Sequence, residues 1–238
     1  MNYKKIGLIG IGKWGKILKN KLKKHSKIIF VANSKTNYDS ELKKIDWIFI
    51  ATPDGTHASI VNKCIKKKVN IFCEKPLTKK YSTSLKLFNK ANKNNVLLYV
   101  DDIQSYLNKK IILKKINYIT RQKNSTGNSK NLLFRFAYHD LYFLYDKLKN
   151  YKVKKIQIIN TKRNLKFKIQ FGNKEIFFYY DINSHKKIHQ INSTNFITRK
   201  DVLSKMIKSV LNEKVDFKKN MKKSLFANKI IDMVIKKL

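Results

Sequence analysis

Cysteine, proline and glycine are scarce in this chain of 238 residues, which has two, two and seven of them. Two cysteines, Cys64 and Cys73, cannot form a disulfide framework, and no metal-ligand spacing surrounds them. The low glycine and proline content excludes collagen-like and low-complexity chains. No apolar run approaches the roughly 20 residues of a membrane span, and no signal-peptide pattern precedes the first strand-like run. We therefore expect a reduced, soluble, cytoplasmic protein that binds no metal and no membrane.

Acidic residues are also scarce, with 15 against 54 basic residues and a formal net charge of +39. Only four of the 54 are arginines, so 50 are lysines, and they are spread along the whole chain. Proteins that read nucleic acid favour arginine, whose guanidinium binds phosphates and guanine edges bidentately. Lysine, asparagine and isoleucine share A/T-rich codons, so genomic base composition accounts for their abundance here. We expect no specific nucleic-acid partner, only non-specific attraction to polyanions at low salt.

The hydrophobic fraction of 42% and the aromatic fraction of 12% are sufficient for a packed core. In the first hundred residues, short apolar runs alternate with stretches of helical spacing. The expected strands are 5–11, 28–32, 46–51, 69–73 and 96–100, and the expected helices are 14–24, 58–67 and 80–94. This alternation predicts βαβ units and a parallel sheet. The link 33–45 has room only for a helix of one or two turns.

The pattern changes after about residue 103. Residues 165–171 and 175–182 alternate as half-buried strands around the turn Gly172-Asn173, and 153–161 and 186–192 are weaker strand candidates. The expected helices are 137–149, 201–212 and 221–237. Residues 123–131 are expected to form a loop, and the connection 104–138 that contains them is short. The sequence thus predicts an α/β chain with two domains. A Rossmann-type parallel sheet occupies 1–103, and a smaller α+β domain with a largely antiparallel sheet occupies 104–238.

A glycine motif follows the first expected strand and opens the first expected helix: Gly10-Ile11-Gly12-Lys13-Trp14-Gly15. In this context Gly10 permits a tight turn, and Gly12 lets the main chain approach a pyrophosphate at the helix N-terminus. Gly15 allows the helix to pack closely on the strand. The motif therefore predicts a dinucleotide site, the alternative being a glycine-rich turn without a ligand.

The end of the second expected strand bears on the choice of cofactor. An acidic residue usually binds the ribose hydroxyls of NAD at this place, but no acidic residue occurs before Asp39. Ser34 and Lys35 could instead receive the 2′-phosphate of NADP. We therefore expect NADP more than NAD, although about one residue in five is a lysine, so Lys35 could stand there without any ligand.

Two further segments identify a family. Ala51-Thr52-Pro53-Asp54-Gly55-Thr56-His57 ends the third expected strand, and Glu74-Lys75-Pro76 ends the fourth. With the glycine motif, these segments resemble the Gfo/Idh/MocA oxidoreductases, which include glucose–fructose oxidoreductase and inositol 2-dehydrogenase. The resemblance runs to about residue 103, and it resumes at His139 and in the two terminal helices.

The resemblance implies roles for these residues. Thr52 and Pro53 would border the ribose and pyrophosphate of the cofactor, and Glu74 would lie near the nicotinamide. Lys75 would contact both the nicotinamide ribose and the substrate hydroxyl, and its bond to Pro76 would be cis. The implied cofactor-binding set is Gly10, Gly12, Lys13, Trp14, Gly15, Ser34, Lys35, Thr52, Pro53, His57, Glu74, Lys75 and Pro76.

His139, in a His-Asp-Leu segment, is similar to the catalytic histidine of the family. An imidazole titrates near neutral pH and can accept the hydroxyl proton as hydride leaves the same carbon. Relatives commonly carry an aspartate four residues before this histidine and another three residues after it, whereas Arg135 and Tyr142 stand here. Asp140 or Asp146 could compensate for the missing carboxylate.

The resemblance implies an NAD(P)-dependent oxidoreductase that acts on a sugar, a cyclitol or a sugar nucleotide, with Lys75 and His139 as catalytic residues. Arg135 and Tyr142 keep a second hypothesis open, a catalytically impaired regulatory or partner protein that binds cofactor on the same fold. We also expect a homo-oligomer, because the second sheet is rich in Phe and Tyr and its open face would otherwise meet water.

Overall fold

The computed structural model describes residues 3–124, 128–161, 164–198 and 200–238. Contacts divide the chain into two compact units, Met1–Tyr106 with Asp201–Leu225, and Leu107–Lys200 with Phe226–Leu238. These units differ from the domains expected at 1–103 and 104–238, because the segment 201–225 belongs with the first unit. Two contacts illustrate why: the Asn220 side chain exchanges hydrogen bonds of 2.8 and 2.9 Å with the main chain of Val100, and the ammonium of Lys223 lies 2.7 Å from the Asp102 carboxylate.

A five-stranded parallel sheet forms the centre of the first unit, with strand order β2-β1-β3-β4-β5. Its strands are β1 (Lys5–Ile9), β2 (Lys27–Ala32), β3 (Trp47–Ile50), β4 (Asn70–Cys73) and β5 (Leu98–Val100). Its helices are α1 (Lys13–Leu22), α2 (Asp54–Lys66), α3 (Tyr81–Lys93) and α6 (Val202–Leu211), with 3₁₀ turns at Glu41–Lys44 and Ile103–Leu107. Every strand expected in this part of the chain is present, and the expected parallel sheet is confirmed.

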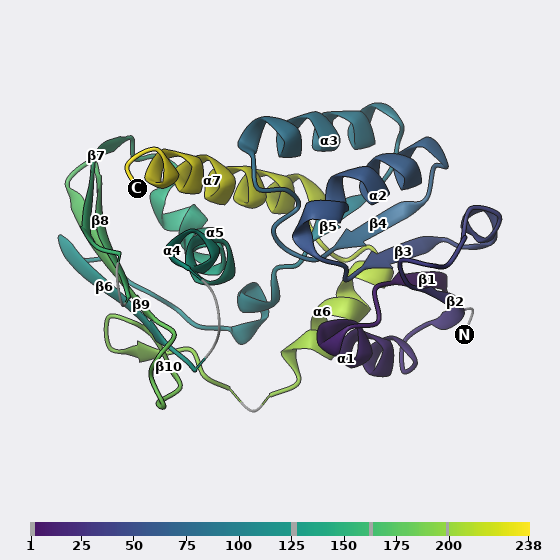
Figure 1. The fold of residues 1–238 in the computed structure, drawn as a ribbon, viewed down its shortest axis with the longest axis horizontal. Coiled ribbons are helices and arrows are strands. Elements are labelled where there is room, and N and C mark those ends of the chain that lie inside the picture. The colour runs from purple at the N-terminus through teal and green to yellow at the C-terminus, as the bar shows by residue number, and fades with distance from the viewer. Residues whose placement is uncertain (1–2, 125–127, 162–163, 199) are drawn as a thin grey trace. The chain divides into compact units, whose positions relative to one another are not determined.

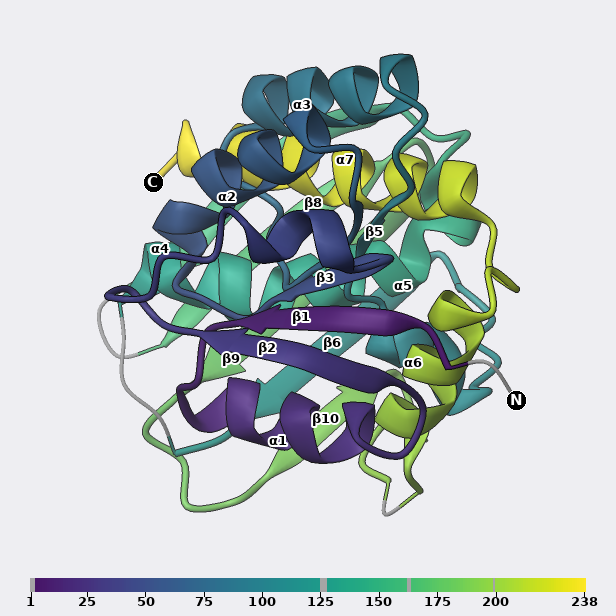
Figure 2. The ribbon, with the colours of Figure 1, turned by 90° about the vertical axis from the view of Figure 1, so that its right-hand side faces the viewer.

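Helices cover both faces of this sheet, with α1 on one side of β1 and β2 and with α2 and α3 on the other (Figure 2). All four residues of β3 are buried, as expected for a central strand of a parallel sheet. One face of the sheet packs on apolar residues of α1 and α6, and the other packs on α2, α3 and the first turns of α7 (Phe217–Ile235). The helix expected from Ala58 begins earlier, at Asp54, directly after Pro53.

The second unit contains a six-stranded sheet of order β11-β10-β6-β9-β8-β7. Its strands are β6 (Ile116–Gln122), β7 (Val153–Asn160), β8 (Leu165–Phe171), β9 (Lys174–Asp181), β10 (Ile188–Ile191) and β11 (Thr194–Asn195). Neighbouring strands are antiparallel, except that β6 is parallel to β9, so the expectation of a largely antiparallel sheet is confirmed. Helix α4 (Ser129–Leu132), helix α5 (Tyr138–Leu148) and the last turns of α7 lie on one side of this sheet (Figure 1).

Two expectations for the second unit need correction. The strand β6 lies within the connection 104–138, for which no strand was expected. The loop expected at 123–131 ends sooner, because α4 begins at Ser129; residues 125–127 of that loop lie outside the described part.

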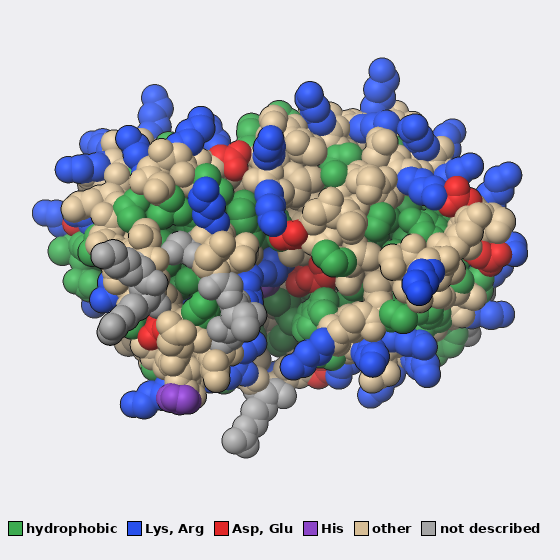
Figure 3. All heavy atoms as spheres, viewed as in Figure 1, with side chains coloured by type: hydrophobic (Ala, Val, Ile, Leu, Met, Phe, Trp, Pro, Cys, Tyr) green, Lys and Arg blue, Asp and Glu red, His purple; other side chains and the backbone are tan. Residues whose placement is uncertain are grey.

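Basic side chains are scattered over the visible surface instead of forming one stripe (Figure 3). This distribution agrees with a compositional origin of the positive charge. Within the described ranges, no helix is both long and apolar enough to cross a membrane.

Candidate functional site

The predicted site residues of the first unit lie at the carboxyl ends of its parallel strands. The hydrogen-bond ladder continues past the strands through four main-chain amides: Gly10 N donates to Ala32 O, Ala51 N to Ile9 O, Glu74 N to Ile50 O and Asp101 N to Cys73 O, at 2.8 to 2.9 Å. These amides bring the glycine turn, Thr52 and Lys75 to one edge of the sheet. The strand order reverses between β1 and β3, and ligands of open α/β sheets bind at such a switch point.

The glycine turn has the geometry that a dinucleotide phosphate requires. Gly10 has a φ of +100°, which favours glycine. A Cβ on Gly15 would lie 1.9 Å from the carbonyl oxygen of Gly10, so only glycine lets α1 approach β1 this closely. A Cβ on Gly12 would meet nothing within 4 Å, which leaves its main chain open to a ligand.

The start of α1 is also free to receive an anion. Gly12 is its N-cap, no side chain caps the first amides, and its first turn contains no acidic residue. Uncapped amides at a helix N-terminus attract phosphate groups. The turn and the helix therefore fit the diphosphate of a nicotinamide dinucleotide.

The segment after β2 is exposed at Ser34 and Lys35. The preceding Asn33 uses its own side chain locally, because its Oδ1 accepts hydrogen bonds from Lys35 N at 2.9 Å and from Thr36 Oγ1 at 3.1 Å. No carboxylate is supplied by residues 33–38 at this position.

His57 lies behind the site, with 1% of its surface exposed. Its Nδ1 lies 2.8 Å from the carbonyl oxygen of Pro76, and its Nε2 lies 2.9 Å from that of Thr52. The ring thus joins the loop after β3 to the loop after β4. That His57 binds cofactor stays a prediction, and from these contacts we propose in addition that it holds Thr52 and Pro76 in place.

Glu74 is the centre of a buried polar cluster. The indole N–H of Trp14, from the first turn of α1, donates to its carboxyl group, and Asp101 forms a side-chain hydrogen bond with it. Burial, reinforced by Asp101, raises the pKa of Glu74 well above its ordinary value. Burial likewise raises the pKa of Asp101 to about 6, against the opposing charge of Lys75. A carboxyl group with a raised pKa can keep its proton and donate it in such a hydrogen bond.

Lys75 follows Glu74, is half-buried, and lies close enough to lower the pKa of both carboxyl groups. The Lys75–Pro76 bond is cis, as the family resemblance implied. The sequence motifs include Trp14, Glu74 and Lys75 but not Asp101. The available signal was the Asp101-Asp102 pair directly after an apolar strand.

His139 belongs to the second unit, where it occupies the second position of α5 and is half-buried. The preceding segment, Leu133–Ala137, is a π-helical turn that contains Arg135. A π turn changes the phase between residues on either side of it, so Arg135 and His139 are not in ordinary i, i+4 register. The charge at Arg135 therefore departs from the aspartate expected of relatives, and the π turn changes its position relative to His139.

Asp140, next to His139, is fully buried against the sheet. Its Oδ1 lies 2.9 Å from Arg121 Nη2 and 2.9 Å from His189 Nε2, and its Oδ2 accepts a hydrogen bond of 2.9 Å from Tyr180. Burial alone would raise the pKa of Asp140, but Arg121 and these hydrogen bonds hold it below the ordinary value. Burial and Arg121 lower the pKa of His189. The network anchors the start of α5, which carries His139, to β6, β9 and β10.

Replacing Asp140 by asparagine is expected to lower the free energy of unfolding by about 3–5 kcal/mol, because Arg121 would keep a buried charge without its counterion. Because the native pKa of Asp140 is depressed, its contribution is present above the unfolded pKa and is lost as pH falls through the native pKa. Urea unfolding at several pH values measures both effects. Asp146→Asn, at an exposed pair 3.7 Å from Lys149, is the control, with a loss of about 0.5 kcal/mol or less. Equal losses in the two variants would contradict this role.

Comparisons with known proteins concern the family and the fold. Residues 16–102 match the sequence model of an oxidoreductase family with an NAD-binding Rossmann fold. Over 116 residues the chain is 27% identical to myo-inositol 2-dehydrogenase of Thermotoga maritima, which covers 40% of this chain and 35% of that protein. Over 65 residues it is 29% identical to an uncharacterized oxidoreductase of Streptococcus pneumoniae, which covers 27% and 18%. The matches thus span about a third or less of these two curated relatives.

Solved structures resemble the chain over nearly its whole length. UDP-N-acetylglucosamine 3-dehydrogenase GnnA of Acidithiobacillus ferrooxidans superimposes with a TM-score of 0.83, 14% identity and 98% coverage of both chains. The WlbA (WbpB) dehydrogenase of Thermus thermophilus, solved with NAD and UDP-GlcNAcA, gives a TM-score of 0.75 at 10% identity, covering 96% of this chain and 94% of that one. At such low identity the likeness concerns the fold.

Proposed function

Because this chain belongs to the Gfo/Idh/MocA family of oxidoreductases, we propose that it is an NAD(P)-dependent enzyme acting on a secondary alcohol or ketone. The substrate we propose is a sugar, a cyclitol or a sugar nucleotide. The observation that carries the proposal is the shared sheet edge, where the open glycine turn follows β1 and Lys75 follows β4 of the same parallel sheet. The names of the similar proteins support the substrate class, since they are an inositol dehydrogenase, a UDP-N-acetylglucosamine dehydrogenase and a dehydrogenase solved with NAD and UDP-GlcNAcA.

In this proposal the first unit binds the cofactor and orients the substrate. Main-chain amides at Gly12 and the start of α1 hold the diphosphate, and Thr52 and Pro53 border it. A bound nicotinamide would supply or accept the hydride. The carboxyl groups of Glu74 and Asp101 lie beside the Lys75 ammonium, whose charge lowers the pKa of both. That ammonium orients and polarises the substrate oxygen.

His139 is the acid–base group of the proposed mechanism. Its imidazole accepts the hydroxyl proton during oxidation and returns it during reduction. The Asp140 network fixes the helix from which the ring projects, so it sets the position of the ring without contacting the substrate.

We propose NADP as the preferred cofactor, since Ser34 and Lys35 are exposed where NAD-specific sites carry a carboxylate. Fluorescence titration of the wild type should give tighter binding of NADPH than of NADH. Lys35→Asp should reverse the order, because it removes a cation for the 2′-phosphate and supplies an acceptor for the ribose hydroxyls. Lys86→Asp, an exposed α3 lysine, controls for net charge and should keep the wild-type order. Preference of the wild type for NADH would overturn the NADP assignment.

A second candidate function is a cofactor-binding regulatory or partner protein without turnover. Arg135 and Tyr142 favour it, because they stand where relatives carry aspartates that assist the histidine. Binding of NADPH with no oxidation of it by any keto-sugar in a broad panel would favour this candidate over the enzyme.

We also propose that copies of the chain associate through the open face of the second sheet. Tyr118 is 58% exposed there and stacks on Phe177 at 5.3 Å, and Ile116 is exposed beside it. An apolar surface of this kind is typical of an interface. Analytical ultracentrifugation of the same protein sample tests this proposal. A sedimenting species with the mass of one chain, 28.1 kDa, would contradict it.

A further inference from the structure

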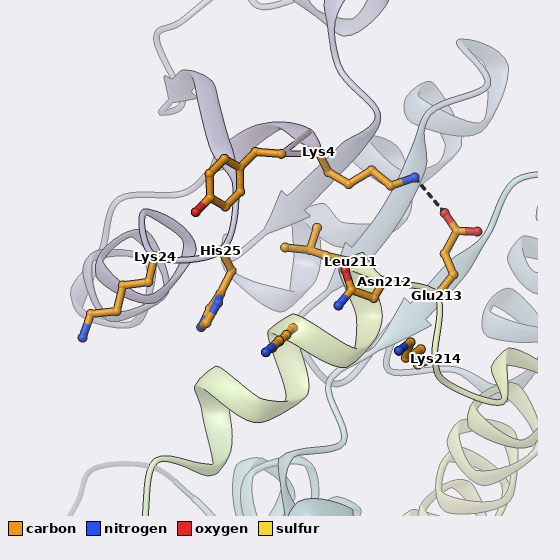
Figure 4. A pocket seen from close by; sticks show the side chains of 9 residues that line it. Lys4, Lys24, His25, Leu211, Asn212, Glu213 and Lys214 are labelled. Carbon is orange, nitrogen blue, oxygen red and sulfur yellow. Dashed lines mark hydrogen bonds and ion pairs between the residues drawn. The ribbon is translucent and has the colours of Figure 1, made fainter. Parts of the chain in front are cut away.

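The first unit contains a pocket of about 730 Å³ at the edge of the sheet opposite the glycine turn, where β1 begins (Figure 4). Its lining residues are Tyr3, Lys4, Lys24, His25, Lys208, Leu211, Asn212, Glu213 and Lys214. They come from the segment entering β1, from the end of α1 and from the end of α6. The five residues of β1 separate this pocket from Gly10 by roughly 16 Å, so it is distinct from the proposed cofactor site.

The charge of the pocket is positive even after its partners are counted. Glu213 is its one carboxylate, and the Lys4 ammonium lies 3.1 Å from it (Figure 4). Within the described residues, no ion pair joins Lys24, Lys208 or Lys214 to a carboxylate. The C-terminal ends of α1 and α6 add about half a negative charge each. Three lysines outweigh these two partial charges.

The lysines of the pocket also affect the pKa of His25. Its Nε2 lies 2.6 Å from the hydroxyl oxygen of Ser204, and burial together with Lys208 lowers its pKa. The ring therefore adds a polar group to the pocket beside the charge of Lys208. Asn212 and Tyr3 add an amide and a phenol at the rim.

We propose that this pocket binds a small phosphate-bearing anion of the size of pyrophosphate or a mononucleotide. Lys24, Lys208 and Lys214 supply the countercharge, and the volume lies in the range of small-molecule sites. Lysine recognises phosphate as a point charge and does not need the bidentate geometry of arginine. The proposal does not depend on the oxidoreductase activity, because none of the lining residues belongs to the cofactor set.

The test is an NMR titration of His25 with pyrophosphate at 150 mM NaCl. Saturable binding should raise the pKa of His25, because an anion favours the imidazolium. The double variant Lys24→Gln/Lys208→Gln should bind at least about tenfold more weakly, since two cationic contacts are lost. The matched control, Lys86→Gln/Lys93→Gln, removes two exposed lysines of α3 and should keep the wild-type affinity and His25 shift.

A response of His25 that never saturates would overturn the proposal, as would an equal loss of affinity in the two double variants. Either result would reduce the effect to the general attraction of a strongly basic chain for anions. Pyrophosphate could also bind at the glycine turn, but that event leaves the His25 pKa unchanged and is insensitive to Lys24 and Lys208. If NADPH did not bind in the cofactor titration, saturable binding of pyrophosphate beside His25 would therefore still support the anion pocket.

Discussion

Replacing His139 by alanine is expected to lower the turnover of NADPH with a keto-sugar substrate by about 10²- to 10⁴-fold. The variant would lack the group that donates or accepts the hydroxyl proton, whereas its cofactor-binding residues would be intact. Those residues belong to the first unit and His139 belongs to the second, so the affinity for NADPH should stay at the wild-type value. Absorbance of NADPH measures turnover, and fluorescence titration measures binding on the same samples.

Two controls separate catalysis from folding in this experiment. His185→Ala removes an exposed histidine of the same unit and should retain wild-type turnover. Lys75→Ala should also lose turnover, with Lys86→Ala as its matched control. Activity of His139→Ala at the wild-type level would reject His139 as the acid–base group while leaving the cofactor proposal open.

Gly15→Ala should impair both folding and cofactor binding. The new Cβ would lie 1.9 Å from the carbonyl oxygen of Gly10, a main-chain atom that moves only if α1 moves away from β1. We expect unfolding to require about 1–3 kcal/mol less free energy, as for an overpacked core, and NADPH binding to fall below detection. Urea unfolding and fluorescence titration measure the two effects.

The other glycines of the site region provide the controls for Gly15→Ala. A Cβ on Gly12 would meet nothing within 4 Å, so Gly12→Ala should keep stability but weaken NADPH binding, because it fills the space kept for the diphosphate. Gly55, in the first turn of α2, is equally open, and Gly55→Ala should retain both properties. NADPH binding by Gly12→Ala at the wild-type affinity would argue that the turn holds no dinucleotide.

The first unit was largely predictable from the sequence, since its signals are local. Buried strands such as β3 are continuous apolar runs, and the glycine motif sits between a strand and a helix as its function requires. The position of the site residues at one edge of the sheet then followed from a general rule, because the carboxyl ends of parallel strands lie on the same side. The role of His57 did not follow, since its two carbonyl partners become neighbours only when β3 and β4 pair.

The strand β6 shows why the second unit was harder to predict. Its inward-facing residues are Asn117, Ile119 and Arg121, so polar side chains occupy two of the three core positions. Its outward face carries Ile116 and Tyr118 instead. A pattern that puts polar residues inside cannot be assigned to a strand from periodicity alone. It is tolerated here because Asp140 neutralises Arg121 and because Asn117 bonds the main chain of Lys114 and Glu175.

The sequence by itself determined the order of strands and helices between β1 and β5, the glycine turn and the placing of Thr52, Glu74 and Lys75 at strand ends, since each depends on neighbours within a few positions. Only the tertiary structure decided that Asp101 lies against Glu74, that Arg121, Tyr180 and His189 enclose Asp140, and that residues 201–225 complete the first unit and its basic pocket. These arrangements join residues far apart in the chain. Their energies come from burial and from the pairing of charges, which no local pattern records.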